Sequence, residues 1–386
     1  MVKKKNIYFI AFLGALSLLL AACTSSSGGT DDSTNNSSSN GNKNGEVRGV
    51  TDDEIIIGNI VAHSGPAAAY TQIAQGAETY IDYVNENGGV HGRQIKFITY
   101  DGEYTPAVEM QQAQRLVEEE GIFLMLGNDC TPCNTALMDY YEQNDVLSLM
   151  VASGAQAFME PINDNYFGSL ISNYRIETRI FYDFAVNDLG AEKIAVVYQN
   201  DDFGKEGYEA VQAVKDEYDV ELVEEVPFVA TAEDFSTQAQ QVKQSGADTV
   251  IMLSTPNPAA KLKQEFHNIG LTDINYIVSS VAGHDLTQYD LAGDVWEGTY
   301  SAGTIPMPDA PEAQGDETIE KYVELFTEKY PSENYSGFPQ VGYAGAEVLV
   351  EALERAGEDL NYDTLREALY TFDNWTDGTY AGVTFS

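Results

Sequence analysis

The first clear pattern in the chain is a short apolar run followed by a helical repeat. Residues 55–61, Ile-Ile-Ile-Gly-Asn-Ile-Val, have the β-branched composition of a strand buried on both faces. The turn Ser64-Gly65-Pro66 interrupts this run, and from Ala67 to Val84 apolar residues recur every three or four positions, as on one face of a helix. Asn87-Gly88-Gly89 ends that helix, and residues 95–100 form the next predicted strand. The stretch predicts a strand–helix–strand unit with a polar turn at the carboxyl end of its first strand, where open parallel sheets bind ligands.

The same alternation continues toward the C-terminus. Further strands are predicted over 122–126, 146–151, 193–198, 220–227, 249–253 and 275–278. Helices are predicted over 105–119, 134–144, 174–189, a segment ending at 217, 235–245 after the N-cap Asp234, 259–269, 318–330 and 341–356. The alternation restarts near residue 174, and roughly 340 residues exceed what one hydrophobic core usually holds. We therefore predict an α/β fold with two Rossmann-like lobes, each built on a parallel sheet.

Several predicted strands end in short turns of small residues. The strand over 122–126 ends in Gly-Asn-Asp-Cys-Thr, and the strand over 146–151 ends in Ala-Ser-Gly-Ala. Small residues at these positions leave backbone N–H groups and hydroxyls open to a ligand. The chain has no GxGxxG or Walker pattern in the first turn, so the sequence indicates neither a nucleotide nor another cofactor.

The N-terminus has the pattern of an export signal. Residues 1–22 combine Lys3-Lys4-Lys5 with an apolar stretch that is short for a membrane span, and we expect them to be removed. Leu20-Ala21-Ala22-Cys23 resembles a bacterial lipoprotein cleavage box, in which Cys23 becomes the lipidated first residue; the alternative is an ordinary secretory signal with a chance cysteine. Residues 23–48 are rich in Ser, Thr, Asn and Gly, a composition typical of a flexible tether.

The formal net charge of −41 narrows the class of partners. A chain this acidic is repelled by nucleic acid and by anionic membrane surfaces, so we expect neither as a direct partner. The excess of acidic residues also suggests adaptation to high salt, in which screening over a few ångströms removes the self-repulsion.

Three groups of residues could indicate metal binding or catalysis. Cys130 and Cys133 form a CxxC pair, for which we expect a local disulfide or two inert thiols, because the scattered histidines offer no further zinc ligands at suitable spacing. The adjacent Asp201 and Asp202 are more typical of a turn and helix cap than of catalytic carboxylates. His63 has neither an orienting acid nor a nucleophile elbow near it in sequence. We therefore expect no enzyme activity and no metal.

The ordered motifs resemble one family. GVTDDEIIIGNIVAHSGPAAAY, GAETYIDYVNENGGVHGR, YQNDDFGK and VGYAGA are similar to segments of the extracytoplasmic substrate-binding proteins of branched-chain amino acid type ABC importers. This resemblance implies two α/β lobes, joined by three crossings near Asn173, Gly298 and Trp375, that close over a small ligand. It implies a first lobe of residues 49–172 and 299–375 and a second lobe of residues 173–298 and 376–386. The end of the chain resembles a segment that continues further in the family, so we expect either a fragment or a second lobe without its last strand.

The resemblance also implies which residues face the ligand. It places Tyr70 against the ligand and Thr131, Ser153 and the backbone around Gly154 and Ala155 at a carboxylate or an equivalent acceptor. In the second lobe it places Phe203, Thr255 and Ser280 across the cleft. Amino-acid-binding members have an acidic side chain about where Ser280 stands, and usually a hydroxyl where Ala155 stands. The resemblance therefore implies a ligand other than a branched-chain amino acid, either an aromatic or other organic acid or an amide.

The function implied by the resemblance is that of a solute receptor. The protein is expected to be a monomer, anchored outside the cell membrane through its lipid, which captures a small organic molecule by hinge closure and delivers it to an ABC permease. The alternative is a receptor of the same fold that passes ligand occupancy to a signalling partner.

Overall fold

The computed structural model describes residues 47–380 and 382–385. The predicted signal segment, Cys23 and all but the last residues of the predicted tether therefore lie outside the described residues. Within the described residues, no helix combines the length and the apolar character that are needed to cross a membrane.

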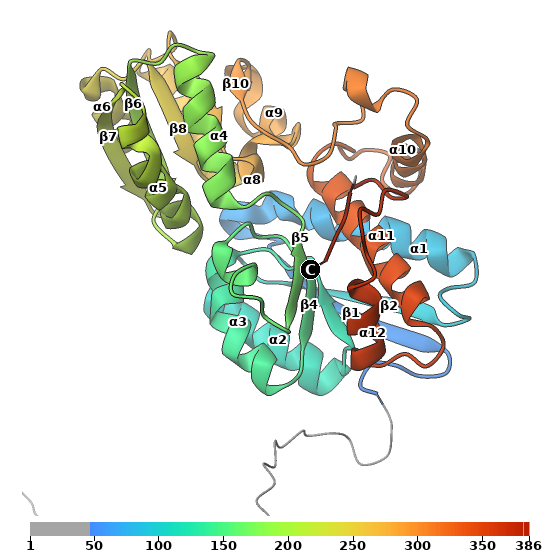
Figure 1. The fold of residues 1–386 in the computed structure, drawn as a ribbon. Helices are drawn as coiled ribbons and strands as arrows, with labels where there is room; N and C mark the ends of the chain where they lie inside the picture. The colour runs from blue at the N-terminus through green and yellow to red at the C-terminus, as the bar shows by residue number, and fades with distance from the viewer. Residues whose placement is uncertain (1–46, 381, 386) are drawn as a thin grey trace, which may run out of the picture. The chain divides into compact units, whose positions relative to one another are not determined.

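The first lobe is built on a five-stranded parallel sheet with the order β2-β1-β3-β4-β5 (Figure 1). The strands are β1 (Glu54–Val61), β2 (Gln94–Asp101), β3 (Leu124–Leu126), β4 (Leu147–Val151) and β5 (Tyr166–Ser169). Strand β1 lies between β2 and β3, with Ile57 opposite Phe97 on one side and Leu124 on the other. The side chains of β4 are buried along its whole length, as expected for a parallel sheet covered by helices.

Helices from both ends of the described chain cover the first sheet. They are α1 (Thr71–Glu86), α2 (Pro106–Gln114), α3 (Thr131–Gln143), α10 (Glu317–Lys329), α11 (Phe338–Ala356) and α12 (Tyr362–Leu369), with helical turns η1 (Gly65–Tyr70), η2 (Arg115–Glu120) and η3 (Gln156–Phe158). Helix α11 lies beside α1, and glycines permit their close approach (Figure 1). A Cβ atom at Gly76 would lie 1.8 Å from the carbonyl oxygen of Pro339, and one at Gly342 would lie 1.9 Å from that of Ile73. This contact fixes the N-terminus of α11 next to the start of α1.

The second lobe repeats the construction with the strand order β10-β9-β8-β6-β7. Its strands are β6 (Lys193–Gln199), β7 (Glu221–Phe228), β8 (Thr249–Leu253), β9 (Asn275–Val278) and β10 (Thr299–Tyr300). Its helices are α4 (Tyr174–Asn187), α5 (Asp202–Val214), α6 (Ser236–Ser245), α7 (Pro256–Asn268), α8 (Ser280–Gly283) and α9 (Thr287–Ala292), with turns η4 (Lys215–Glu217) and η5 (Gly293–Trp296); η6 (Pro311–Ala313) follows in the return to the first lobe. Two parallel-sheet α/β lobes confirm the predicted fold class.

The structure differs from the sequence prediction in several local features. Strand β5 and helices α8, α9 and α12 were not predicted, and α6 has Phe235 at its N-cap, while the Asp234 carboxylate accepts a hydrogen bond from the Ser236 amide at 2.8 Å. The last described residues were expected in the second lobe. Instead, Val383 and Phe385 pack against the core of the first lobe, where the rings of Phe385 and Phe372 lie 5.4 Å apart. Burial of these two apolar side chains against the first lobe removes them from water, which favours this position.

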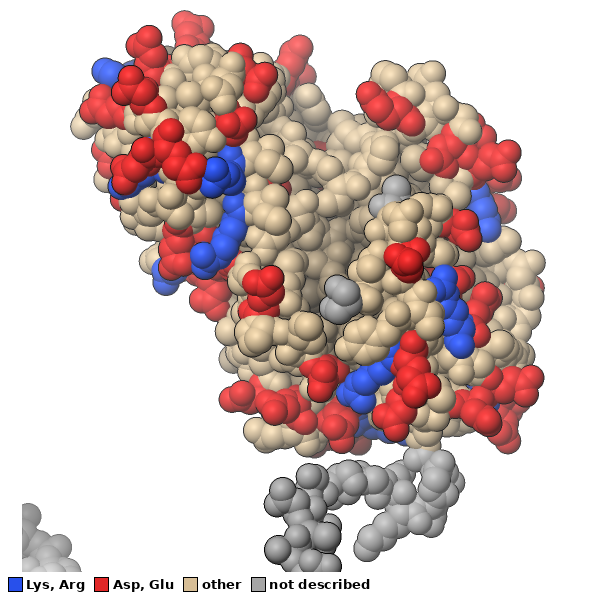
Figure 2. All heavy atoms as spheres, in the orientation of Figure 1, with Lys and Arg blue, Asp and Glu red and all other residues tan. Residues whose placement is uncertain are grey.

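The excess of acidic residues is visible on the protein surface. Figure 2 shows Asp and Glu side chains over both lobes and fewer Lys and Arg side chains between them. Salt bridges such as Arg179–Glu217 pair some of these charges. Because Lys and Arg together number 20 against 61 Asp and Glu, most acidic side chains have no basic residue to pair with.

Candidate ligand-binding site

A cavity lies between the two lobes and receives residues from both. Its wall consists of first-lobe residues, residues of the connecting segments and second-lobe residues: Tyr70, Ile73, Asp129, Ala152, Phe338 and Val341; Ile171, Gly303 and Thr304; and Ser280, Val281 and His284. The volume open to the centres of water molecules is about 30 Å³. This is room for one or two waters.

The cavity is positioned by the carboxyl ends of the parallel strands. Asp129 follows β3, Ala152 follows β4, and Ser280 follows β9. Parallel strands place these ends at one edge of each sheet, which is where open α/β sheets bind ligands. The close packing of α11 on α1 adds Phe338 and Val341 from the other side.

Tyr70 connects the two lobes across this cavity. Its side chain is 6% exposed, and its hydroxyl donates a hydrogen bond to the carbonyl oxygen of Val281 at 2.7 Å. Its ring meets that of Phe338 edge-on, with 5.0 Å between centroids. The structure therefore brings Tyr70 to the cavity wall, together with Ser280.

The other residues named from the sequence lie behind the wall. Thr131 and Ser153 are buried, and their hydroxyl oxygens lie 2.7 Å apart in a hydrogen bond, with the Tyr174 hydroxyl 3.2 Å from that of Thr131. Gly154 packs so closely on the first connecting segment that a Cβ atom would lie 1.9 Å from the carbonyl oxygen of Ser172. Ala155 is also buried, and its amide faces the Ser153 hydroxyl at 3.4 Å. These groups already bind one another, and a contact with the ligand stays a prediction for them.

The same holds in the second lobe for Phe203 and Thr255. Phe203 is buried against the ring of Tyr174, with 4.8 Å between centroids. The Thr255 hydroxyl donates to the side-chain oxygen of Gln199 at 2.8 Å. Phe203 lies at the start of α5 and Thr255 at the N-cap of α7. Neither residue lines the cavity.

Asp129 is a wall residue that the sequence reasoning missed. Its side chain is fully buried; one carboxylate oxygen accepts a hydrogen bond from the Ala62 amide at 3.2 Å, and the other has no partner among the described residues. Burial raises the pKa of Asp129 to about 7, although the Ala62 hydrogen bond acts in the opposite direction. Its position in the small turn after β3 was a usable signal, but the resemblance directed attention to Thr131 in the same turn.

His284 and Glu177 complete the polar side of the site. His284 lines the cavity, its Nε2 has no partner among the described residues, and burial lowers its pKa, so the ring is neutral at pH 7. Glu177, on α4, accepts a hydrogen bond from the Ser280 amide at 2.9 Å, and burial raises its pKa to about 7. The Ser280 hydroxyl makes no hydrogen bond of ordinary geometry among the described residues, yet it lies close enough to the Glu177 carboxylate to act, with the Ser280 amide, against the rise in the pKa of Glu177.

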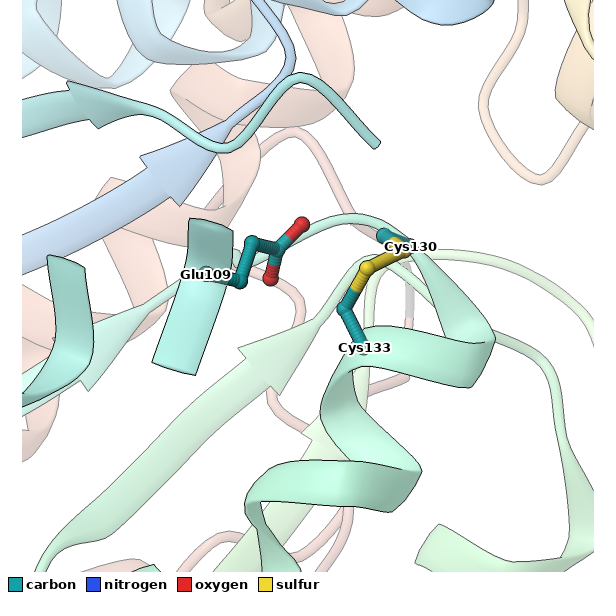
Figure 3. A group of neighbouring side chains, drawn as sticks. All are labelled: Glu109, Cys130 and Cys133. Atoms are coloured by element: carbon teal, nitrogen blue, oxygen red, sulfur yellow. A yellow bond between two sulfur atoms is a disulfide. The ribbon is translucent and has the colours of Figure 1, made fainter. Parts of the chain in front are cut away.

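The CxxC pair lies one residue beyond Asp129. Cys130 and Cys133 form a disulfide at the start of α3, and the carboxylate of Glu109 points toward it (Figure 3). The oxygen of Glu109 and the two sulfurs lie within 4.8 Å of one another. Sulfurs bonded to each other are not thiolate ligands, so this arrangement does not form a zinc site of the usual kind.

Comparison with known proteins shows the family to which the chain belongs. A family model described as periplasmic binding protein matches residues 54–386. The Leu/Ile/Val-binding protein homolog 3 of Brucella melitensis biotype 1 is 24% identical over 319 residues, which cover 82% of this chain and 83% of that protein.

Solved structures share the fold at lower sequence identity. A fatty acid ABC transporter substrate-binding protein from Thermomonospora curvata superposes with a TM-score of 0.77 at 21% identity, covering 88% of this chain and 86% of the other. The branched-chain amino acid transporter substrate-binding protein LivJ of Streptococcus pneumoniae, solved with isoleucine, gives a TM-score of 0.74 at 18% identity, covering 86% and 92%. All three are named as binding proteins, and those from Brucella melitensis and Streptococcus pneumoniae carry names of the branched-chain amino acid type that the sequence resembles.

Proposed function

Because the chain belongs to the periplasmic binding protein family, which implies an extracytoplasmic location, we propose that it is the solute receptor of an ABC importer. It captures a small organic molecule between its lobes and presents the closed form to the permease. The observation that carries this proposal is the composition of the cavity, whose wall is shared by both lobes and their connecting segments. A ligand that touches both walls stabilises the closed arrangement through its higher affinity for that form.

The contact between Tyr70 and Val281 supports the same mechanism. It is a hydrogen bond between a side chain of the first lobe and the backbone of the second, made beside the cavity. Its net contribution is about 1 kcal/mol. It is one of several hydrogen bonds between the lobes: the Asn257 side chain also donates to the Gly65 carbonyl oxygen at 3.0 Å, and the Phe338 amide donates to the Asp285 carboxylate at 2.8 Å.

A thermal-shift screen of small organic solutes tests the binding step. A ligand present at about 100 times its dissociation constant should stabilise the folded chain by about 2.7 kcal/mol. Tyr70→Ala should abolish the shift, whereas Tyr289→Ala, which removes a tyrosine that is 45% exposed, should leave it unchanged. A broad library without a single stabilising compound would contradict the proposal.

The membrane attachment is a second part of the proposal. The cleavage box before Cys23 supports a diacylglyceryl anchor on this residue, with the tether holding the receptor near its permease. Cys23→Ser in the full chain should move the protein from the membrane fraction to the soluble fraction and prevent labelling by radioactive palmitate. Equal membrane retention and labelling of the two forms would refute the anchor.

A further inference from the structure

Three buried polar atoms without partners belong to residues of the cavity wall. They are an oxygen of Asp129, the hydroxyl of Ser280 and Nε2 of His284. Most other wall residues are apolar, among them Ile73, Ile171, Val281, Phe338 and Val341. Buried polar atoms in folded proteins almost always have partners, so unpartnered ones around a cavity indicate where a ligand donates or accepts hydrogen bonds. All three atoms can accept a hydrogen bond, and the Asp129 carboxyl group is an acceptor without also being a donor only when it is ionised.

The charges near the cavity have one sign. No lysine or arginine belongs to its wall in the part of the chain that the structure describes. The acidic groups are Asp129 on the wall and two carboxylates behind it: Glu177 accepts the amide hydrogen of Ser280, and Asp285 accepts that of Phe338. A carboxylate ligand would meet these acids in a site of low polarity without any cation to compensate its charge.

Resting on the proposed function, we propose that the ligand is an organic cation, a primary amine on an apolar body, and that the site rejects carboxylates, including zwitterionic amino acids. An ammonium group has three N–H donors and no acceptor, which complements a set of acceptors that includes one carboxylate. The branched and aromatic wall residues would cover a short branched or aromatic hydrocarbon body. This class replaces the organic acid expected from the sequence.

The proposal predicts a particular pH dependence of binding. In the ligand-free protein Asp129 has a pKa of about 7, raised by burial and by Asp101, so part of the population carries a proton there at neutral pH. An ammonium ligand requires the ionised form, and its affinity should fall about tenfold per pH unit below 7 and level off above it. Other titratable groups around the site are Tyr70, Tyr174, Asp201 and Glu109, which contribute to the local field, and the buried carboxyls of Glu177 and Asp285, whose pKa values burial raises to about 7 and about 6. Neutral His284 would oppose the cation if it gained a proton.

The decisive experiment is calorimetric titration of the full chain with compounds that share one hydrocarbon body. 3-Methylbutylamine, leucinamide, leucine, 4-methylpentanamide and 4-methylpentanoate carry respectively an ammonium, an ammonium with an amide, both charges, a neutral amide and a carboxylate. 2-Phenylethylamine and phenylacetate repeat the comparison with an aromatic body. We expect each amine to bind at least 30-fold more tightly than the matching carboxylate and at least 10-fold more tightly than the amino acid.

Two variants separate the charge of Asp129 from general effects of buried acids. Asp129→Asn should weaken amine binding about 100-fold, reduce its pH dependence to the part that Glu177 behind the wall contributes, and change amide binding less than threefold. Glu109→Gln is the matched control, since Glu109 is a fully buried acid without hydrogen-bond partners among the described residues that lies off the cavity wall. It should leave the ranking of the compounds unchanged.

The outcomes distinguish the ligand class from the receptor function. Tighter binding of leucine or of either carboxylate, or amine affinity that does not change between pH 6 and pH 8, overturns the cation class and leaves the receptor function standing. Failure of every compound in the series also overturns the class, and the solute library described above then decides the receptor function separately. The pH profile of the unsubstituted protein keeps the test valid even if Asp129→Asn does not fold.

Discussion

Replacing Asp129 by Asn should stabilise the ligand-free protein at alkaline pH. In the folded protein burial raises the pKa of Asp129 from 3.8 to about 7. Between these values the folded state holds a proton that the unfolded state has lost, so the free energy of unfolding falls as the pH rises through this window and stays low above pH 7. An Asn side chain at this position does not titrate, so the free energy of unfolding of the variant should not fall over this window. The variant should therefore become more stable than the unsubstituted protein as the pH increases.

The size of the effect follows from the pKa change and from the hydrogen bonds. A rise of about three units corresponds to a cost of about 4 kcal/mol above pH 7. The Asn oxygen can still accept the hydrogen bond from the Ala62 amide, but its NH₂ group replaces the unpartnered oxygen and stays without an acceptor, at a cost of about 2 kcal/mol. We expect a net gain of about 2 kcal/mol at pH 8, or about 3 °C in melting temperature, and a loss of similar size at pH 4.

Calorimetric melting of both proteins between pH 3 and pH 8 measures this difference. Asp101→Asn is a control of opposite sign. Burial acts on Asp101 as well, but hydrogen bonds donated by the Glu103 amide, the Ser64 hydroxyl and the His63 amide outweigh it and lower the pKa of Asp101. Its replacement should therefore cost more stability at pH 8 than at pH 3. If Asp129→Asn is equally destabilising at both ends of the range, the electrostatic account of the site is refuted.

Three further predictions concern hinge, disulfide and surface charge. Tyr70→Phe removes the hydrogen bond to Val281 and should weaken a ligand found in the screen about fivefold by calorimetry; an unchanged affinity would show that this contact does not favour closure. The double replacement Cys130→Ser with Cys133→Ser opens a short covalent loop and should lower the free energy of unfolding by about 2 kcal/mol in urea titrations, whereas equal midpoints would contradict a structural role for the disulfide. The melting temperature should rise between about 0.01 M and 1 M NaCl as the net charge of −41 is screened, and a flat response would remove the case for adaptation to salt.

The fold could be predicted from the sequence wherever the hydrophobic period was clear. Strand β1 and helix α11 were recognised because one is a run of β-branched residues and the other an apolar repeat of helical period. Strand β5 was missed because it has four residues, Tyr-Phe-Gly-Ser, of which Gly168 has a φ of +72°. A segment this short and this irregular becomes a strand only by pairing with β4.

The site could be predicted only in part, because its chemistry depends on contacts distant in sequence. Tyr70 and Ser280, which the resemblance placed against the ligand, line the cavity, and their contact with a ligand stays a prediction. The same resemblance placed Thr131 and Ser153 against the ligand, but Tyr174 arrives from the next helix and takes part in their hydrogen bonding. Asp129 has an ordinary turn sequence, and only the assembled lobe buries its carboxylate and leaves one oxygen free.

Small-angle X-ray scattering of the protein with and without a saturating ligand from the screen tests the central claim most directly. If the lobes close around a bound molecule, the radius of gyration should fall and the scattering curve should change shape as the binding sites fill. Superimposable curves at zero and full occupancy would contradict capture by closure.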